Sequence, residues 1–381
     1  NRRGGVPMLD SGLSGRRLIP GIIGILLLLM PAASPGQDAA APDSVDVPTG
    51  STVILPVLGY TPDTKLMLGA VAMRFFYLDK PGPETRPSVF SPTFIYTVKN
   101  QIMVYAGTDL NWDEGRSHAG VFPNYIKFPD QFYGTGRQVD LDDEEDYTSE
   151  QINLELKFDR EVLGHLRPGV YYRIQRHRLV KRDPDGQLAG GAINGVDNST
   201  VSLPGISLAW DTRDNLWSPS RGSWLQLLAA TSHGTFGSDY RFNRFYVDFR
   251  GYYSLGEEAV LAGQLLGTGL DGDPPFFSLP RLGGEEGLRG YRGGLFIDKT
   301  RVLGRVDYRR DRILGRFGGV LFAGIGDVAS SVGKLTLAGK LWSAGFGIRY
   351  LWDEAEKLKI RLDFGFGNGD SGFYLTLGEA F

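Results

Sequence analysis

The sequence contains no cysteine and only four histidines in 381 residues. Without cysteine there is no disulfide framework, no thiolate zinc site and no cysteine nucleophile. Positive charge is not in excess either, because 41 Lys and Arg stand against 44 Asp and Glu, for a net charge of −3. A protein that binds nucleic acid usually carries a basic surplus that neutralises phosphates. We therefore expect no nucleic acid among its partners.

Long apolar runs are also scarce. The one clear run covers residues 18–30, follows Arg16 and Arg17, and is succeeded by small residues up to Gly36. This order is typical of a secretory signal peptide, and the run is shorter than the roughly 20 residues that a transmembrane helix needs. We expect residues 1–36 to be a signal peptide and the small, polar residues 37–51 to be a disordered lead. Any later membrane crossing must then use strands.

Glycine and aromatic residues are abundant, with 53 Gly, 22 Phe, 17 Tyr and 6 Trp. Apolar and polar residues alternate with a period of two in several places, as in residues 244–250 (RFYVDFR), 152–158 (INLELKF) and 359–366 (KIRLDFGF). This period is that of a β-strand with one apolar and one polar face. No sustained helical stripe follows residue 37, so the pattern predicts an all-β fold.

Alternation alone does not separate a soluble β-sandwich from a membrane barrel. Three features favour the membrane: the export signal, aromatic residues near many strand ends, and connectors that alternate between short and long. We predict that residues 52–381 form a single antiparallel transmembrane β-barrel of about sixteen strands, because closed barrels usually have an even strand number. The expected strands are 52–58, 66–78, 91–98, 102–112, 117–126, 148–159, 168–180, 204–213, 222–232, 241–253, 258–270, 301–310, 318–330, 341–351, 357–366 and 371–381.

If the last strand ends on the periplasmic side, the connectors 127–147, 181–203 and 271–300 lie on the outer side. The first of these carries an acidic run at 142–146, which we expect to be a solvated loop, with a divalent-cation site as the alternative. The last contains seven Gly and three Pro in about 30 residues, and loops of that length are usually functional or disordered.

Arg289 lies at the centre of the 271–300 connector, next to Gly290. If the connector folds back into the lumen, the guanidinium can pair with a carboxylate of the wall. Asp307 is our first choice of acceptor, and Asp363 and Asp327 are the other expected lumen-facing acids. The alternative is that Arg289 sits on a mobile outer loop.

Five motifs in this order resemble those of the BamA/TamA family of outer-membrane barrels, also called the bacterial surface antigen family. They are Tyr60-Thr61-Pro62-Asp63-Thr64; Phe128-Pro129 with Phe132-Tyr133-Gly134-Thr135-Gly136; Asp211-Thr212-Arg213-Asp214-Asn215 with Pro219 and Gly222; Leu288-Arg289-Gly290-Tyr291; and Leu377-Gly378-Glu379-Ala380-Phe381.

The resemblance implies a sixteen-stranded barrel with its sixth outer loop folded into the lumen and a weak seam between the first and last strands. By the same resemblance, Leu288, Arg289, Gly290 and Tyr291 form the loop anchor and Asp307 is its acceptor. The ending with Gly378 and Phe381 would be the recognition signal for the chain's own insertion, although a terminal aromatic also suits the membrane girdle. Family members insert or fold other outer-membrane proteins, or move polypeptides or lipids across the membrane.

The sequence departs from the family in two places. The residues ahead of the first strand do not accommodate the periplasmic POTRA domains, each of about 75 residues, so we expect a barrel-only member. In addition, the segment 322–326 (FAGIG) lacks the Asp that often faces the loop arginine. This predicts that Arg289 is held more loosely, or by Asp307 alone.

We therefore expect an integral protein of the bacterial outer membrane, without enzymatic activity, that inserts, assembles or translocates proteins or lipids. Its expected partners are outer-membrane lipid and either a separate periplasmic protein or a client outer-membrane protein. A passive pore is the alternative, since a charged lumen suffices for one. A hydrolase would need one of His118, His165, His177 or His233 beside a hydroxyl and an acid, which we do not expect. No cofactor or metal motif is present.

Overall fold

The computed structural model describes residues 52–80, 87–215, 218–336, 340–354 and 357–381. The expected signal peptide and disordered lead, residues 1–36 and 37–51, lie outside these ranges. None of the helices in the described part of the chain is long and apolar enough to cross a membrane.

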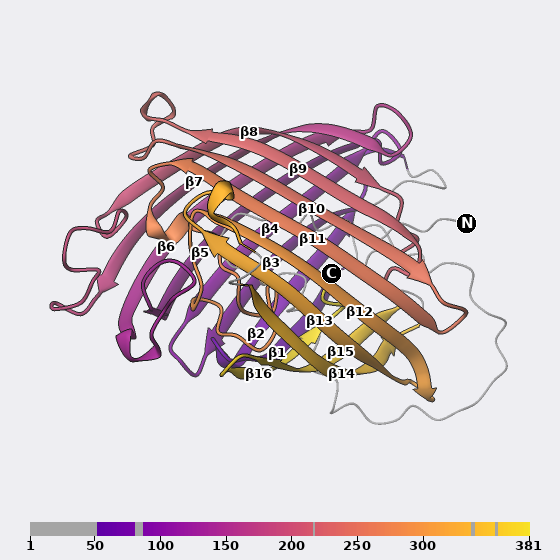
Figure 1. The fold of residues 1–381 in the computed structure, drawn as a ribbon. Helices are drawn as coiled ribbons and strands as arrows, with labels where there is room; N and C mark the ends of the chain where they lie inside the picture. Colours follow the sequence, from indigo (N-terminus) through magenta and orange to yellow (C-terminus); the bar gives the residue numbers. More distant parts are fainter. Residues whose placement is uncertain (1–51, 81–86, 216–217, 337–339, 355–356) are drawn as a thin grey trace, which may run out of the picture.

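The described residues form one closed antiparallel barrel in which each strand pairs with its neighbours in sequence and β1 pairs with β16 (Figure 1). This confirms the predicted all-β barrel of sixteen strands. The strands are β1 (Thr52–Thr61), β2 (Lys65–Phe76), β3 (Ser88–Thr97), β4 (Ile102–Trp112), β5 (Ser117–Phe132), β6 (Glu145–Arg160), β7 (Leu166–Lys181), β8 (Ser199–Asp211), β9 (Gly222–Ser232), β10 (Phe242–Ser254), β11 (Ala259–Gly272), β12 (Thr300–Leu314), β13 (Phe317–Ala329), β14 (Leu341–Asp353), β15 (Leu358–Gly367) and β16 (Ser371–Leu377). Short 3-10 turns lie in four connectors: η1 (Leu141–Asp143), η2 (Gly234–Phe236), η3 (Phe276–Ser278) and η4 (Val332–Lys334).

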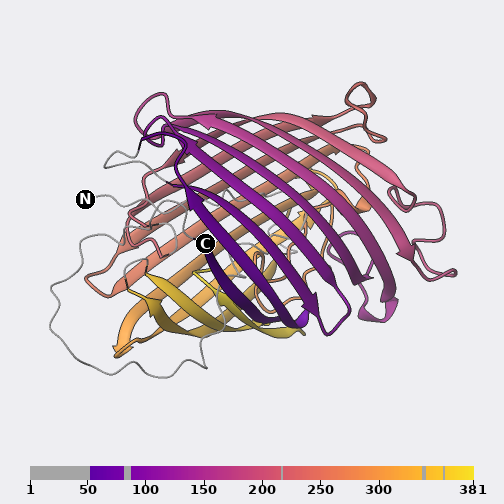
Figure 2. The ribbon, with the colours of Figure 1, turned by 180° about the vertical axis from the view of Figure 1, so that it is seen from behind.

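The two faces of the strands have the polarity of a membrane barrel. On β10, Phe245, Val247 and Phe249 point outward and are exposed, whereas Arg244 and Asp248 point inward and are buried. The apolar side chains therefore face lipid and the charged ones face the interior, the reverse of a soluble sandwich. The view from behind shows the N-terminal strands tilted side by side across the wall (Figure 2).

Connector length distinguishes the two ends of the barrel. One end carries the long connectors 133–144, 182–198 and 273–299, and the other carries short turns such as 113–116. Outer-membrane barrels have short periplasmic turns and longer extracellular loops. We call the end with the long connectors the outer end; β1 begins and β16 ends at the opposite, periplasmic end.

Many strand limits differ from the predicted ones by a few residues, and those of β5, β6 and β16 matter most for the interior. β5 and β6 pair from Ser117↔Arg160 to Phe132↔Glu145, so this hairpin extends further into the outer connector than expected. The acidic run at 142–146 is consequently not a single loop, because it runs from η1 into β6. At the other extreme, β16 ends at Leu377, four residues short of the predicted limit, because Gly378 adopts a left-handed conformation with φ of +79°.

Candidate functional site

The connector between β11 and β12, residues 273–299, lies against the inward face of the barrel. Its backbone closes on itself, since the amide of Leu282 donates to the carbonyl of Phe296 at 3.0 Å and that of Gly284 to Tyr291 at 2.9 Å. Most of its side chains are buried although it is not a strand. A segment this long keeps one conformation only if it packs on the wall around it.

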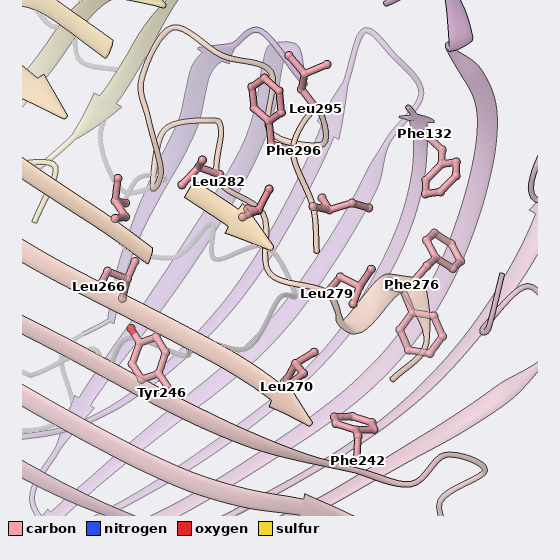
Figure 3. Close-up of a cluster of buried hydrophobic side chains, with 14 of the residues drawn as sticks. Phe132, Phe242, Tyr246, Leu266, Leu270, Phe276, Leu279, Leu282, Leu295 and Phe296 are labelled. Carbon is pink, nitrogen blue, oxygen red and sulfur yellow. The ribbon is translucent and has the colours of Figure 1, made fainter. Parts of the chain in front are cut away.

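The first half of the connector packs on the wall formed by β5, β6 and β7. The rings of Phe276 and Phe277 meet the ring of His177 at 5.8 and 3.9 Å, and Phe276 also meets Phe132 edge to face. Figure 3 shows this cluster, in which Phe276 lies beside Phe132. The same cluster includes Leu279 and Leu282 of the connector and side chains of β10 and β11. Burial of several aromatic and aliphatic groups stabilises this half, at roughly 25 cal/mol per Å² of apolar surface removed from water.

The second half carries Arg289 to the opposite wall. Its Nη2 donates to Asp307 Oδ1 on β12 at 2.5 Å, and its Nη1 donates to Asp363 Oδ2 on β15 at 2.6 Å. The guanidinium also lies 3.5 Å from the centre of the Phe322 ring on β13. Arg289 is 1% exposed and both carboxylates are fully buried. Burial alone lowers the pKa of this guanidinium, but the charges of Asp307 and Asp363 outweigh burial and raise the pKa, so Arg289 stays a cation.

The register of β12 to β15 brings the residues around Arg289 together on the inward face of the wall. Asp307 lies opposite Phe322, Phe322 opposite Gly345, and Gly345 opposite Gly365, so these four residues form one row across the wall. The ring of Phe322 lies over Gly345, where a Cβ would come within 2.4 Å of it. At the end of the row, a Cβ on Gly365 would come within 2.5 Å of the Arg289 carbonyl carbon. The connector backbone can therefore rest directly on β15.

The neighbours of Arg289 make their own contacts with the wall. Gly290 has φ of +117° and its amide donates to the Tyr374 hydroxyl at 2.9 Å. The Tyr291 hydroxyl donates to the Trp342 carbonyl at 2.9 Å. Leu288 is fully buried next to Gly324, where a Cβ would come within 2.9 Å of Leu288 Cδ2.

The expectation that Arg289 is held loosely or by Asp307 alone is wrong. Asp363 supplies a second carboxylate from β15, and the segment 322–326, which lacks an Asp, instead supplies the ring beneath the guanidinium. Asp327, the third expected acceptor, pairs with Arg137 at 3.1 Å and does not meet Arg289.

The segment after β16 turns into the barrel next to the Arg289 site. Glu379 Oε2 accepts from Arg349 Nε at 2.9 Å, and Glu379 Oε1 accepts from Lys359 Nζ at 3.3 Å. Arg349 also donates to Asp363 at 2.5 Å, so one ion network joins Glu379 to the acceptor of Arg289. Burial alone raises the pKa of Glu379, but the charges of Arg349, Arg309 and Lys359 outweigh it, and its pKa lies well below the ordinary value.

Phe381 lies inside the barrel and not on a lipid-facing strand, so its placement in the membrane girdle is wrong. It is 6% exposed and packs against Tyr252 and Ala262. The guanidinium of Arg309 lies 5.1 Å from its ring centre and donates to its carbonyl oxygen at 2.9 Å. Whether Gly378 and Phe381 act as an insertion signal stays a prediction.

The seam between β1 and β16 is the weakest pairing in the wall. Tyr60 and Leu375 are the one registered pair that joins the two strands among the described residues, whereas every other neighbouring pair of strands is registered over seven or more. The Tyr60 ring stacks on Phe373 at 3.9 Å across the same seam. Each missing pair leaves backbone donors and acceptors on the strand edges without ladder partners.

Residues 92–381 match the Omp85 superfamily domain. The chain belongs to the Omp85 superfamily. As a member, it is an integral outer-membrane barrel.

Solved structures show the same fold as this Omp85 barrel at low sequence identity. BamA from Haemophilus ducreyi, in a form lacking POTRA domains 1–3, is 14% identical with a TM-score of 0.60, over 87% of this chain and 70% of that one. CdiB from Acinetobacter baumannii is 10% identical with a TM-score of 0.52, over 86% of this chain and 59% of that one. CdiB from Escherichia coli is 10% identical with a TM-score of 0.57, over 89% of this chain and 63% of that one. A comparison with curated proteins finds no match in sequence.

The four histidines of the Omp85 barrel have distinct surroundings. His118 lies between Asp159, at 2.9 Å from Nδ1, and Asp109, at 3.1 Å from Nε2. His177 stacks on Phe277, His165 packs edge-on against Trp210, and His233 caps η2. Among the described residues, no group of three or more His, Asp or Glu has the arrangement to hold a metal ion.

Sequence reasoning missed three participants in the site: Arg349, Tyr374 and the inward turn that buries Glu379. Arg349 on β14 and Tyr374 on β16 both point inward. The alternation of polar and apolar residues along these strands could have identified them as lumen-facing. The inward turn had one signal, Gly378, since a glycine at the end of a strand permits a left-handed break.

Proposed function

We propose that this Omp85 barrel inserts or translocates polypeptide or lipid at the outer membrane by opening the seam between β1 and β16. The single observation that carries the proposal is that, among the residues the structure describes, these two strands are registered only at Tyr60↔Leu375. Superfamily members are transporters or insertases, which supports the same conclusion. The chain spans 59–70% of the solved structures it resembles, so cargo and partners belong to this proposal.

The edge of β1 supplies a physical route for a client strand. On its other side β1 pairs with β2 along its whole length, from Thr52↔Arg74 to Thr61↔Lys65, so it is a firmly held template. Its seam-side edge has no registered partner from Thr52 to Gly59 in the described chain. An incoming extended segment can add to such an edge by main-chain hydrogen bonds. We propose a client outer-membrane protein strand, or lipid passing the open seam, as the cargo.

The connector inside the lumen favours passage of cargo through an opened seam over passage of solutes through the lumen. The 273–299 connector meets β5–β7 through Phe276 and Phe277, and it meets β12–β15 through Arg289. It therefore crosses the lumen. We propose that Leu288, Arg289, Gly290 and Tyr291 anchor it there, with Asp307 and Asp363 as acceptors, and that no catalytic group is involved.

Proteoliposomes test the proposal. Purified barrel is incorporated into liposomes, an unfolded outer-membrane barrel is added, and its folding is followed by its resistance to SDS at room temperature. The proposal predicts faster folding than in empty liposomes, and scrambling of a fluorescent lipid serves as the readout for lipid transfer. Acceleration of neither process contradicts it.

Planar-bilayer recording separates the proposal from a passive pore. A barrel crossed by the connector should give small, flickering currents. A large, steady conductance in the unmodified protein would instead establish the pore.

A further inference from the structure

The two edges of the seam come together at the outer end of the barrel, where the β1–β2 turn meets β16. Pro62 of this turn approaches β16 closely, since a Cβ on Gly372 would come within 2.7 Å of Pro62 Cγ. The registered pair Tyr60↔Leu375 lies next to this end. Further towards the periplasmic end, no registered pair joins the two strands among the residues that the structure describes. The strand edges are therefore held together next to the outer end.

The connector 273–299 makes backbone contacts with the β15–β16 side of the seam at this end. The amide of Gly290 donates to the Tyr374 hydroxyl on β16 at 2.9 Å. The amide of Arg292 donates to Asp370 Oδ2, in the turn between β15 and β16, at 3.1 Å. These two hydrogen bonds hold residues 290–292 against one edge of the seam.

The next residue of the connector bonds to the other side of the seam. The amide of Gly293 donates to Asp63 Oδ1, in the turn between β1 and β2, at 3.0 Å. A Cβ on Gly293 would come within 2.7 Å of Asp63 Oδ2, so the carboxylate lies directly against the connector backbone. The Asp63 carbonyl in turn accepts from Gln101 Nε2 at 3.2 Å, which holds the turn to the neighbouring hairpin. Residues 290–293, which we call the seam clasp, therefore join the two edges of the seam.

We propose that the seam clasp holds the outer end of the seam closed, and that β1 separates from β16 when the bond between Gly293 and Asp63 breaks. Successive amides of one short segment bond to both edges, so the edges can move apart only if the bonds on one side are lost. Arg289, the residue before the clasp, pairs with Asp363 on β15 at 2.6 Å. The clasp therefore stays with β15 and β16 and leaves Asp63. Its role in regulation rests on the proposed function, because a clasp controls cargo only if cargo passes the seam.

The labelling rate of a thiol buried at the seam measures how often the seam opens. Val57 of β1 is 2% exposed and packs in one buried cluster with Leu377 of β16, so Val57→Cys places a thiol that β16 covers. The chain has no cysteine of its own, so a maleimide reports on this position alone. Where opening and closing are fast, the labelling rate follows the population of the open form. Val201→Cys, at a fully buried position on β8, reports on loosening away from the seam.

Two variants break the clasp from opposite sides, and each is combined with the reporter thiol in the full chain in detergent. Asp63→Ala removes the acceptor, and Gly293→Ala places a methyl group where the Asp63 carboxylate lies. Each should speed labelling of the Val57→Cys thiol about tenfold, the factor that corresponds to loss of about 1.4 kcal/mol. Labelling of the Val201→Cys thiol should not change. The double variant should be no faster than the faster single variant, because both remove the same contact.

Asp183→Ala is the matched control, because exposed Asp183 also accepts from a backbone amide at 3.1 Å, but within its own connector. An unchanged rate for Val57→Cys in both clasp variants overturns the proposal, and so does equal acceleration by Asp183→Ala or at Val201→Cys. If Asp63→Ala does not fold, Gly293→Ala decides the outcome. Labelling needs neither client nor lipid transfer. Unchanged labelling in a protein that folds clients therefore rejects the clasp alone, and faster labelling in a protein without that activity rejects the proposed function alone.

Discussion

Replacing Arg289 with alanine isolates the anchor of the connector. The change leaves Asp307 and Asp363 buried without the cation between them, and breaking a buried pair from one side generally destabilises by 3–5 kcal/mol. Both acids retain another cation, because Arg349 lies 2.5 Å from Asp363 and Arg309 lies 3.7 Å from Asp307. We therefore expect the lower end of that range, about 3 kcal/mol, which corresponds to roughly 150-fold in an equilibrium constant.

The loss should appear in two measurements. The free energy of unfolding in denaturant should fall by about 3 kcal/mol, and the small currents in planar bilayers should become larger as the connector leaves the wall. Arg281→Ala is the matched control on the same connector. Arg281 pairs with Asp130 at 3.1 Å but is 28% exposed, so its loss should destabilise by about 1 kcal/mol or less. Equal losses in the free energy of unfolding for the two variants would refute the role of Arg289 as the anchor of the connector. Unchanged currents in Arg289→Ala would refute it as well.

Two further changes probe the surroundings of Arg289. Gly365→Ala places a Cβ 2.5 Å from the connector backbone and should destabilise by about 1–3 kcal/mol in denaturant unfolding, whereas Gly267→Ala, with no atom within 4 Å, should change stability by about 0.5 kcal/mol or less. Equal losses would show that the close approach of the connector to β15 does not matter. Glu379 has a folded-state pKa below its ordinary value of 4.5, so its stabilisation is complete above pH 4.5 and is lost as the pH falls through the folded pKa. Glu379→Gln should therefore lower stability at pH 7 and flatten the acid side of the stability–pH curve, and an unchanged acid side would contradict this role.

Alternation accounts for most of what the sequence could predict. It placed Asp307 and Asp363 on the inward face, since one residue in two along a strand must face lipid. The expected count of sixteen strands rested in addition on the even strand number of closed barrels. It could not choose among inward acids, because that choice depends on how far the strands are staggered. Asp327 also faces inward, but it pairs with Arg137, which belongs to the connector between β5 and β6.

The features that the sequence did not predict depend on the backbone conformation of single residues and on contacts between residues distant in sequence. Gly378 breaks β16 and sends Glu379 inward toward Arg349, Lys359 and Arg309, and a strand pattern does not reveal such a turn. The weak seam was implied by family resemblance alone. Periodicity says nothing about how many pairs β1 and β16 form, because pairing between the first and last strands is set by closure of the whole barrel.

A disulfide across the seam tests the central claim most directly. Tyr60 and Leu375 are directly opposite, and opposed residues in antiparallel strands have Cα atoms about 4.5–5.5 Å apart, within the range that a disulfide spans. The chain has no cysteine of its own, so Tyr60→Cys with Leu375→Cys forms one defined bond. The matched control joins the same Tyr60→Cys to Leu66→Cys on β2, its partner on the other side. The account predicts that the oxidised seam variant loses acceleration of client folding and lipid transfer and regains it with reductant, while the control stays active in both states. Full activity of the oxidised seam variant would contradict opening between β1 and β16.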